Sequence, residues 1–126
     1  MLTVREAIVN SDPVELQGVA RFKFREGELE KFERLSAQCM EIVRAKDTGT
    51  LQYEMFFNDD RSECVVLERY RDSEALIEHA EHLGDLGQAI LRTGWVSGEL
   101  LGDPTAELKA KLRGGKVRLF APFLSL

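Results

Sequence analysis

Apolar side chains recur along the chain at two spacings, and these spacings predict an order of strands and helices. Residues 16–25 alternate, with Phe22 and Phe24 on one face and basic side chains on the other, which is typical of a strand. Between about residues 28 and 46, apolar side chains recur at the spacing of a helix: Leu29, Phe32, Leu35, Cys39, Ile42 and Val43. The polar segment 47–49 is expected to end this helix.

The middle of the chain predicts a hairpin followed by a second helix. Residues 50–58 and 63–71 form strands around a polar turn, and the first strand places four apolar side chains on one side: Leu51, Tyr53, Met55, Phe57. A helix follows, capped at Asp72 or Ser73. Its apolar stripe is Ala75, Leu76, His79, Ala80, Leu83. Gly84 is expected to interrupt it before a short continuation.

The last third adds a strand over 95–101, a helix capped at Asp103 with Pro104 in its first position, and an edge strand over 117–120. The order β-α-β-β-α-β predicts an α+β, ferredoxin-like subunit with a C-terminal helix and strand extension. We therefore divide the chain into three parts: an N-terminal arm (1–15), the ferredoxin-like domain (16–102) and the extension with its apolar tail (103–126).

Both faces of the predicted sheet carry apolar side chains. Met55 stands beside Phe56, and Val65 beside Val66, whereas a sheet with one solvated face alternates polar and apolar residues. A second copy of the chain would cover the extra face and produce a homodimer. The alternative is that a helix or the C-terminal tail folds over it.

Composition limits the classes of function. The chain has 126 residues and a formal net charge of -5, which argues against a nucleic-acid binder. No apolar run is long enough for a membrane span, and the first residues do not form a signal peptide, so we expect a cytoplasmic protein. Cys39 and Cys64 lack metal-type spacing and are expected to be buried free thiols.

Three segments resemble the antibiotic biosynthesis monooxygenase family of dimeric α+β barrels, which includes small quinol monooxygenases. They are ARFKFREGELEKFERL (20–35), GTLQYEMFFND (49–59) and CVVLERYRDSEALIEH (64–79). The resemblance implies a dimeric barrel with a pocket on the sheet face. It also implies oxidation of a hydroxylated aromatic or quinol by molecular oxygen without a flavin, a metal or another cofactor. The alternative is a barrel that binds a small ligand and catalyses nothing.

Such a reaction needs a base, because a hydroquinone becomes a good electron donor once it is deprotonated. His79 is the candidate base, since it lies on an apolar helix stripe and imidazole titrates near neutral pH. Its alternative role is that of a buried packing residue. Glu68 is the second catalytic candidate, because a carboxylate within an apolar strand needs a partner. Its alternative is an ion pair with an arginine such as Arg69 or Arg21, across strands or across the dimer.

Substrate-binding candidates are Tyr53 and Tyr70, whose hydroxyls could meet a phenol, and Trp95, which could close a pocket mouth. His82 follows His79 by three residues, but no third ligand is evident, so we expect no metal site. Haem-degrading relatives resemble one another in an asparagine, a tryptophan and a histidine. These fall near Ala20, His79 and Ala89 here, which argues against haem.

Overall fold

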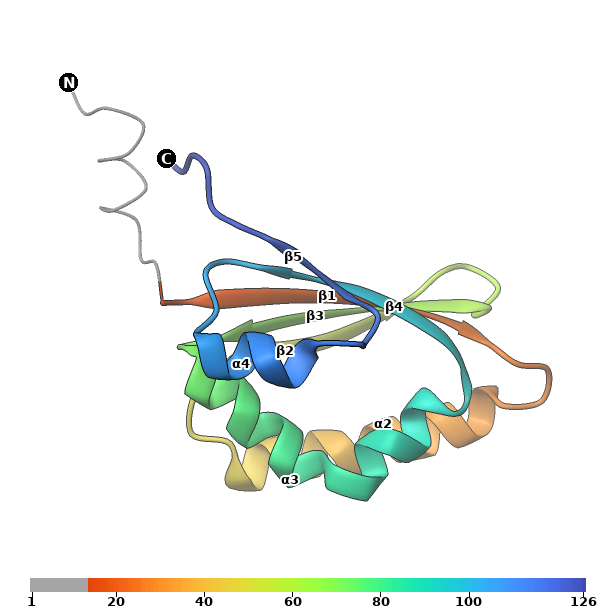
Figure 1. Cartoon of the computed structure of the whole chain (residues 1–126). Helices are drawn as coiled ribbons and strands as arrows, with labels where there is room; N and C mark the ends of the chain where they lie inside the picture. Colours follow the sequence, from red (N-terminus) through yellow and green to blue (C-terminus); the bar gives the residue numbers. More distant parts are fainter. Residues whose placement is uncertain (1–13) are drawn as a thin grey trace.

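The computed structural model describes residues 14–126, so all but the last two residues of the expected N-terminal arm lie outside the described part. The elements follow the predicted order (Figure 1). They are β1 (Leu16–Phe24), α2 (Leu29–Lys46), β2 (Thr50–Phe57), β3 (Glu63–Tyr70), α3 (Ser73–Leu91), β4 (Gly94–Leu101), α4 (Ala106–Leu112) and β5 (Val117–Phe120).

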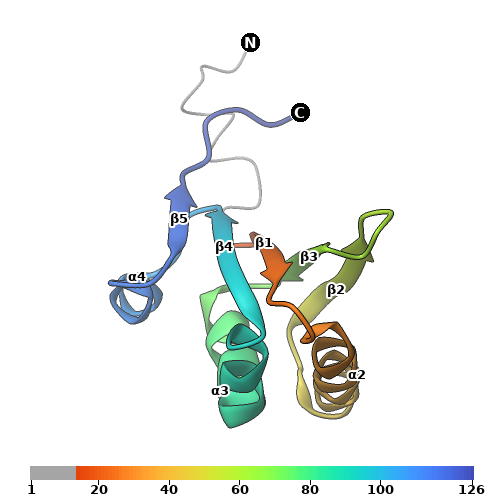
Figure 2. The same cartoon turned by 90° about the vertical axis from the view of Figure 1, so that its right-hand side faces the viewer.

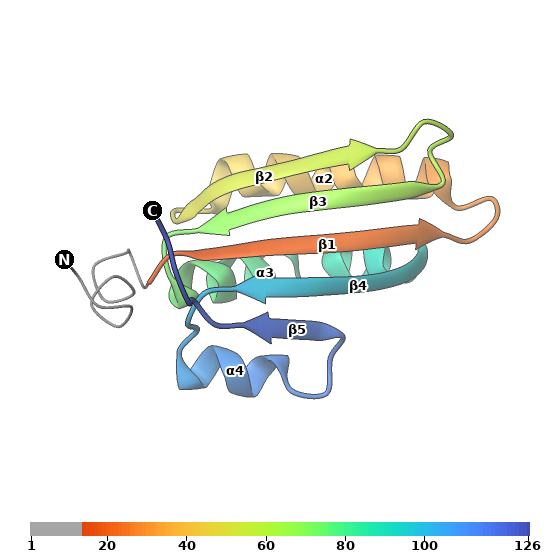
Figure 3. The same ribbon diagram turned by 90° about the horizontal axis from the view of Figure 1, so that it is seen from above.

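The strands form one sheet in the order β2-β3-β1-β4-β5 (Figure 3). The first four are antiparallel to their neighbours, and β5 adds to the edge parallel to β4. This is the strand order of a ferredoxin-like fold with one extra edge strand, and it confirms the predicted α+β architecture.

Helices α2 and α3 lie side by side against one face of the sheet, which we call the covered face (Figures 1 and 2). The main core lies between them and the strands, around Phe22, Phe32 and Leu35. The ring of Phe32 packs against Phe22 and Phe24, with ring centroids 5.3 and 4.6 Å away. Both cysteines are free and buried in this core, as predicted, and burial raises the pKa of the Cys39 thiol to about 11.

A smaller core joins α4 to the sheet edge. Leu108 of α4 is buried with Leu16 and Leu100, and Leu76 and Ile77 of α3 pack against them. The cap predicted for α4 is wrong. Thr105, not Asp103, accepts the hydrogen bond from the Leu108 amide, because Ser73 Oγ holds the Thr105 amide at 3.0 Å and fixes the entry of the helix.

Two expectations of burial are also wrong. Leu51 is half exposed because the β2–β3 register shifts between Thr50 and Gln52, and such a bulge turns a side chain out of the alternation. Ala80 is exposed because Leu76 and Ile77 turn the apolar stripe of α3 toward α4.

The predicted start and interruption of α3 are confirmed. Asp72 caps the helix by accepting from the Ala75 amide at 2.8 Å. Gly84 has φ 46° and ψ -126°, a conformation open to glycine but strained for other residues, and it kinks the helix. The kink lies two residues after His82 and five after His79.

The second face of the sheet, which we call the open face, is not covered by any helix of residues 14–126 (Figure 2). Phe56 and Val65 lie on it among charged side chains. The tail after β5 leaves the sheet on this side and does not reach the helices (Figures 1 and 2). The homodimer through this face stays a prediction. Within the described residues, no helix has the length and apolar character that crossing a membrane requires.

Candidate functional site

His79 points from the first half of α3 toward the covered face. Its side chain is 7% exposed, and Nδ1 lies 2.7 Å from Oδ2 of Asp47. Asp47 is the residue that ends α2, and its own side chain is only 2% exposed. A buried carboxylate therefore holds one nitrogen of a buried imidazole.

Asp47 accepts from two further donors. His82 Nδ1 lies 2.7 Å from Oδ1, and the Thr50 hydroxyl donates to Oδ2 at 2.7 Å. Burial alone would raise the pKa of Asp47, but the hydrogen bonds from His82, Thr50 and His79 outweigh it and lower the pKa. An ionised carboxylate only accepts hydrogen bonds, so both imidazoles carry hydrogen on Nδ1. In neutral His79, Nε2 then presents a lone pair.

Three side chains of the sheet meet His79 on its other side. Glu68 and Tyr70 share a face of β3, and Tyr53 is the register partner of Glu68 on β2. His79 Nε2 lies 3.6 Å from Glu68 Oε1, and the Tyr70 hydroxyl donates to that oxygen at 2.7 Å. The rings of Tyr53 and Tyr70 pack on His79 with centroids 5.1 and 5.2 Å away. We call Asp47, Glu68, His79, Tyr53 and Tyr70 the histidine cluster.

The two tyrosines are hydrogen-bond donors rather than bases. Burial raises the pKa of both hydroxyls, and the nearby Glu68 carboxylate raises them further. Both therefore stay protonated at neutral pH. Among residues 14–126, the structure does not form the ion pair with Arg69 or Arg21 that was the alternative for Glu68. Arg69 pairs with Glu15 and Arg21 with Glu99, and both arginines lie on the open face.

Within the histidine cluster, the Glu68 side chain is 22% exposed to solvent, whereas that of His79 is 7% exposed. A Cβ added to Gly18 on β1 would lie 3.3 Å from Glu68 Oε2, so a side chain at this position would crowd that oxygen. Two surface grooves lie elsewhere, one over Phe56 and Val65 and one between α3 and α4, and neither is lined by His79 or Glu68.

The structure brings together four of the five predicted site residues and leaves out Trp95. Trp95 pairs with Lys23 in the register of β4 and β1, which places it on the open face with 58% exposure. The Arg25 guanidinium lies 5.3 Å from its ring centre. Trp95 therefore does not contact the histidine cluster.

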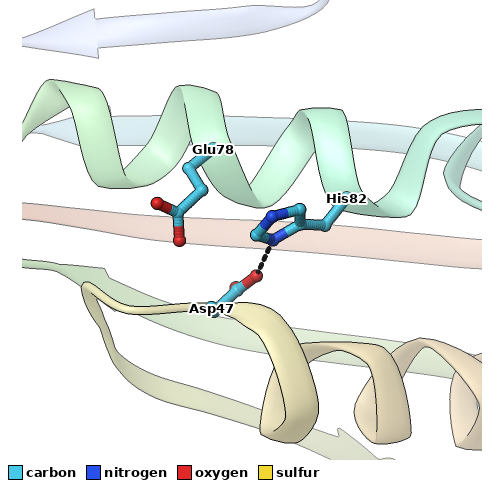
Figure 4. Close-up of side chains that lie close together, drawn as sticks. All are labelled: Asp47, Glu78 and His82. Atoms are coloured by element: carbon cyan, nitrogen blue, oxygen red, sulfur yellow. Dashed lines mark hydrogen bonds and ion pairs between the residues drawn. The ribbon is translucent and has the colours of Figure 1, made fainter.

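Sequence reasoning missed Asp47. Its position at the end of a helix reads as a stop signal, and it is 32 residues away from His79 in the chain. It also missed a possible third ligand beside His82. Asp47, Glu78 and His82 offer three ligand atoms within 4.8 Å of one another, whereas His79 is not part of this set (Figure 4).

A model of the antibiotic biosynthesis monooxygenase family matches residues 18–84, slightly more than half of the chain. The chain belongs to this family. The match confirms the resemblance and, with the strand order, the predicted fold. A sequence search of curated proteins found no match.

Solved structures similar to this chain share its fold. MupZ from Pseudomonas fluorescens matches with a TM-score of 0.72 and 24% identity, over 90% of this chain and 93% of its own. Rv0793 from Mycobacterium tuberculosis matches with a TM-score of 0.63 and 24% identity, over 72% of this chain and 96% of its own. A mutant of SnoaB, a cofactor-independent oxygenase from Streptomyces nogalater, matches with a TM-score of 0.60 and 17% identity, over 73% of this chain and 95% of its own.

Proposed function

We propose that the protein is a cofactor-independent monooxygenase that oxidises a hydroxylated aromatic compound, such as a quinol, with molecular oxygen. Family membership supports the reaction class. SnoaB, which shares the fold, is a cofactor-independent oxygenase. The observation that carries the proposal is the buried Asp47–His79 hydrogen bond of 2.7 Å, which leaves Nε2 facing Glu68 and the two tyrosines.

His79 acts as the base that removes the substrate's hydroxyl proton. Asp47 fixes the hydrogen on Nδ1, so the lone pair of Nε2 points toward the covered face. The 3.6 Å to Glu68 is too long for a hydrogen bond, so Nε2 is available to a substrate hydroxyl. Asp47 also stabilises the imidazolium that forms, as a buried carboxylate does beside a catalytic histidine.

Glu68 and the tyrosines orient the substrate. The Tyr70 hydroxyl holds Glu68 Oε1, which leaves Oε2, the oxygen beside Gly18, to accept a second substrate hydroxyl. The Tyr53 hydroxyl stays protonated and offers a donor to the oxygen that becomes negative. A flat ring with two hydroxyl groups suits this arrangement of one base, one acceptor and one donor.

The oxygen step needs no electron from the protein. The deprotonated quinol gives one electron to oxygen, and the resulting ring radical and superoxide combine to form a new carbon–oxygen bond. The hydroperoxide then loses water, with the proton returned by His79, to leave a hydroxylated quinone. One oxygen atom stays in the product and the other leaves as water, so the substrate supplies all the reducing equivalents. Burial of the cluster keeps water from competing for the anion.

The test is oxygen uptake by metal-stripped protein with a panel of hydroquinones and naphthohydroquinones. We expect uptake well above autoxidation, one labelled oxygen atom in the product from ¹⁸O₂, and a loss of about 100-fold or more in His79→Ala. Gln88→Ala, an exposed change on the same helix, is the matched control and should keep the activity.

The other outcomes are equally informative. Uptake that is equal in the wild type and in His79→Ala would retain an oxygenase but remove His79 from its mechanism. If no quinol supports uptake above autoxidation, the oxygenase proposal fails, and the alternative of a barrel that binds a small ligand becomes the better account.

A further inference from the structure

A second cluster lies on the outer side of Asp47, away from the sheet. It consists of Asp47 from the end of α2 with Glu78 and His82 from α3, whose ligand atoms all lie within 4.8 Å of one another (Figure 4). We propose that these three side chains bind a divalent transition-metal cation such as Zn²⁺. This inference does not depend on the proposed oxygenase activity.

The backbone places the three ligands on one side of the junction between α2 and α3. Glu78 and His82 are four residues apart, so they stand one above the other on the same face of α3. Asp47 approaches from the neighbouring helix and points Oδ1 at His82. Ligands from two rigid elements leave one side open, and the His82 side chain is 26% exposed there. A cation can therefore reach the site from solvent.

Other side chains already hold both carboxylates in position. The Thr48 amide donates to Glu78 Oε1 at 2.8 Å, and the Thr48 hydroxyl lies within 3.1 Å of both Glu78 oxygens. Thr50 and His79 both bind Oδ2 of Asp47, so Oδ1 is the oxygen left for the cluster. Metal ligands in proteins are oriented by an outer layer of hydrogen bonds of this kind.

The charge of the cluster also favours a cation. Among the ion pairs of residues 14–126, Asp47 pairs only with histidines, and Glu78 forms none with a lysine or arginine. Two carboxylates thus stand close together, with histidines and Thr48 rather than a lysine or arginine as their partners. A divalent cation would neutralise this charge, which no lysine or arginine of residues 14–126 pairs with.

The ligand types indicate the class of cation. Mg²⁺ and Ca²⁺ prefer sites made of oxygen atoms alone, whereas an imidazole beside two carboxylates suits Zn²⁺ and its first-row neighbours. Two ligands of a tetrahedral Zn²⁺ stand roughly 3.4 Å apart. The 2.7 Å between His82 Nδ1 and Asp47 Oδ1 must therefore widen by less than about 1 Å. If Nδ1 is the ligand, its hydrogen leaves to solvent.

Calorimetric titration of untagged, chelator-treated protein with Zn²⁺ tests the proposal, and the visible spectrum with Co²⁺ reports the ligand geometry. We expect one site in the wild type, and binding at least about 30-fold weaker in both His82→Asn and Glu78→Gln. Glu81→Gln is the matched control, because Glu81 is an exposed acid next to His82 that belongs to neither cluster. Circular dichroism shows that each variant is folded.

Two results would overturn the site. One is the absence of binding tighter than about 1 mM in the wild type. The other is Zn²⁺ affinity that is unchanged in His82→Asn and Glu78→Gln, which would place the ion elsewhere. Since no substrate is present in the titration, either result leaves the oxygenase proposal to its own test.

Discussion

The two faces of the same sheet differ in what their polar side chains contact. On β3, Glu68 and Tyr70 point to the covered face, where Glu68 meets a hydroxyl and an imidazole. Arg69 between them points to the open face and pairs with Glu15. Alternation along one strand therefore places largely buried hydrogen bonds on one face and solvated ion pairs on the other.

This difference has a chemical consequence. Open-face pairs such as Arg21–Glu99 and Lys23–Glu63 span 3.9 Å between exposed or partly exposed groups, and such pairs contribute little to stability. On the covered face, water is largely excluded from Asp47 and His79, so their interaction is stronger and fixes a tautomer. The comparison teaches that, among residues 14–126, the covered face carries the buried carboxylate–imidazole pair that the proposed proton transfer requires.

The largest expected effect is a difference in unfolding free energy between removing a covered-face ring and removing an open-face ring. Phe32→Ala should lower the free energy of unfolding by about 3–5 kcal/mol, because this α2 ring is 1% exposed and packs on the covered-face rings of Phe22 and Phe24. Phe56→Ala on the open face should cost less than about 1 kcal/mol in the monomer, since Phe56 is 49% exposed. Urea unfolding of protein dilute enough to be monomeric measures both, and equal losses there would contradict the distinction.

Asp47→Asn tests the buried hydrogen bonds. The variant should lose about 2 kcal/mol at pH 7, because the Asn amide cannot replace an ionised acceptor between two imidazoles. The pKa of Asp47 lies below its ordinary value of 3.8 in the folded protein, so its contribution is full above about pH 4 and is lost as the pH falls through the lowered value. Unfolding from pH 7 to pH 3 should show the difference from wild type shrinking. A constant difference would mean that Asp47 is not the titrating group.

Val65→Asp tests whether a second copy covers the open face. Val65 lies opposite Arg21 on this face, and we expect the wild type to sediment as a homodimer and the variant as a monomer. Lys31→Glu on the exposed surface of α2 is the control and should remain dimeric. A monomeric wild type would show that the open face is not an interface between copies.

The smallest effect on stability is expected for Gly18→Ala. The added methyl group would lie 3.3 Å from Glu68 Oε2, so stability should change by less than about 1 kcal/mol. If substrate binds beside this oxygen, the Michaelis constant should rise several-fold. An unchanged Michaelis constant with an active quinol would move the binding site away from Gly18.

Much of the fold could be predicted because strands and helices have different local periods. Alternation at Phe22 and Phe24, and helical spacing around Phe32, predicted the elements and their order. The same patterns placed His79 on an inward-facing position and singled out Glu68 as a strand carboxylate that needs a partner, and the structure brings these two side chains together. For Trp95 the pattern was ambiguous, because Trp95 and Val96 are both apolar and alternation could not choose between the two faces.

The sequence by itself therefore determined the ferredoxin-like order and the inward direction of His79. Only the tertiary structure decided that Asp47 holds His79 and His82 from 32 and 35 residues away. It also decided that Thr105 caps α4, because Ser73 from another helix binds the Thr105 amide. Periodicity is a local property of the chain, whereas these contacts depend on how α2, α3 and α4 pack in space. The partners of a catalytic or metal-binding side chain are set by that packing.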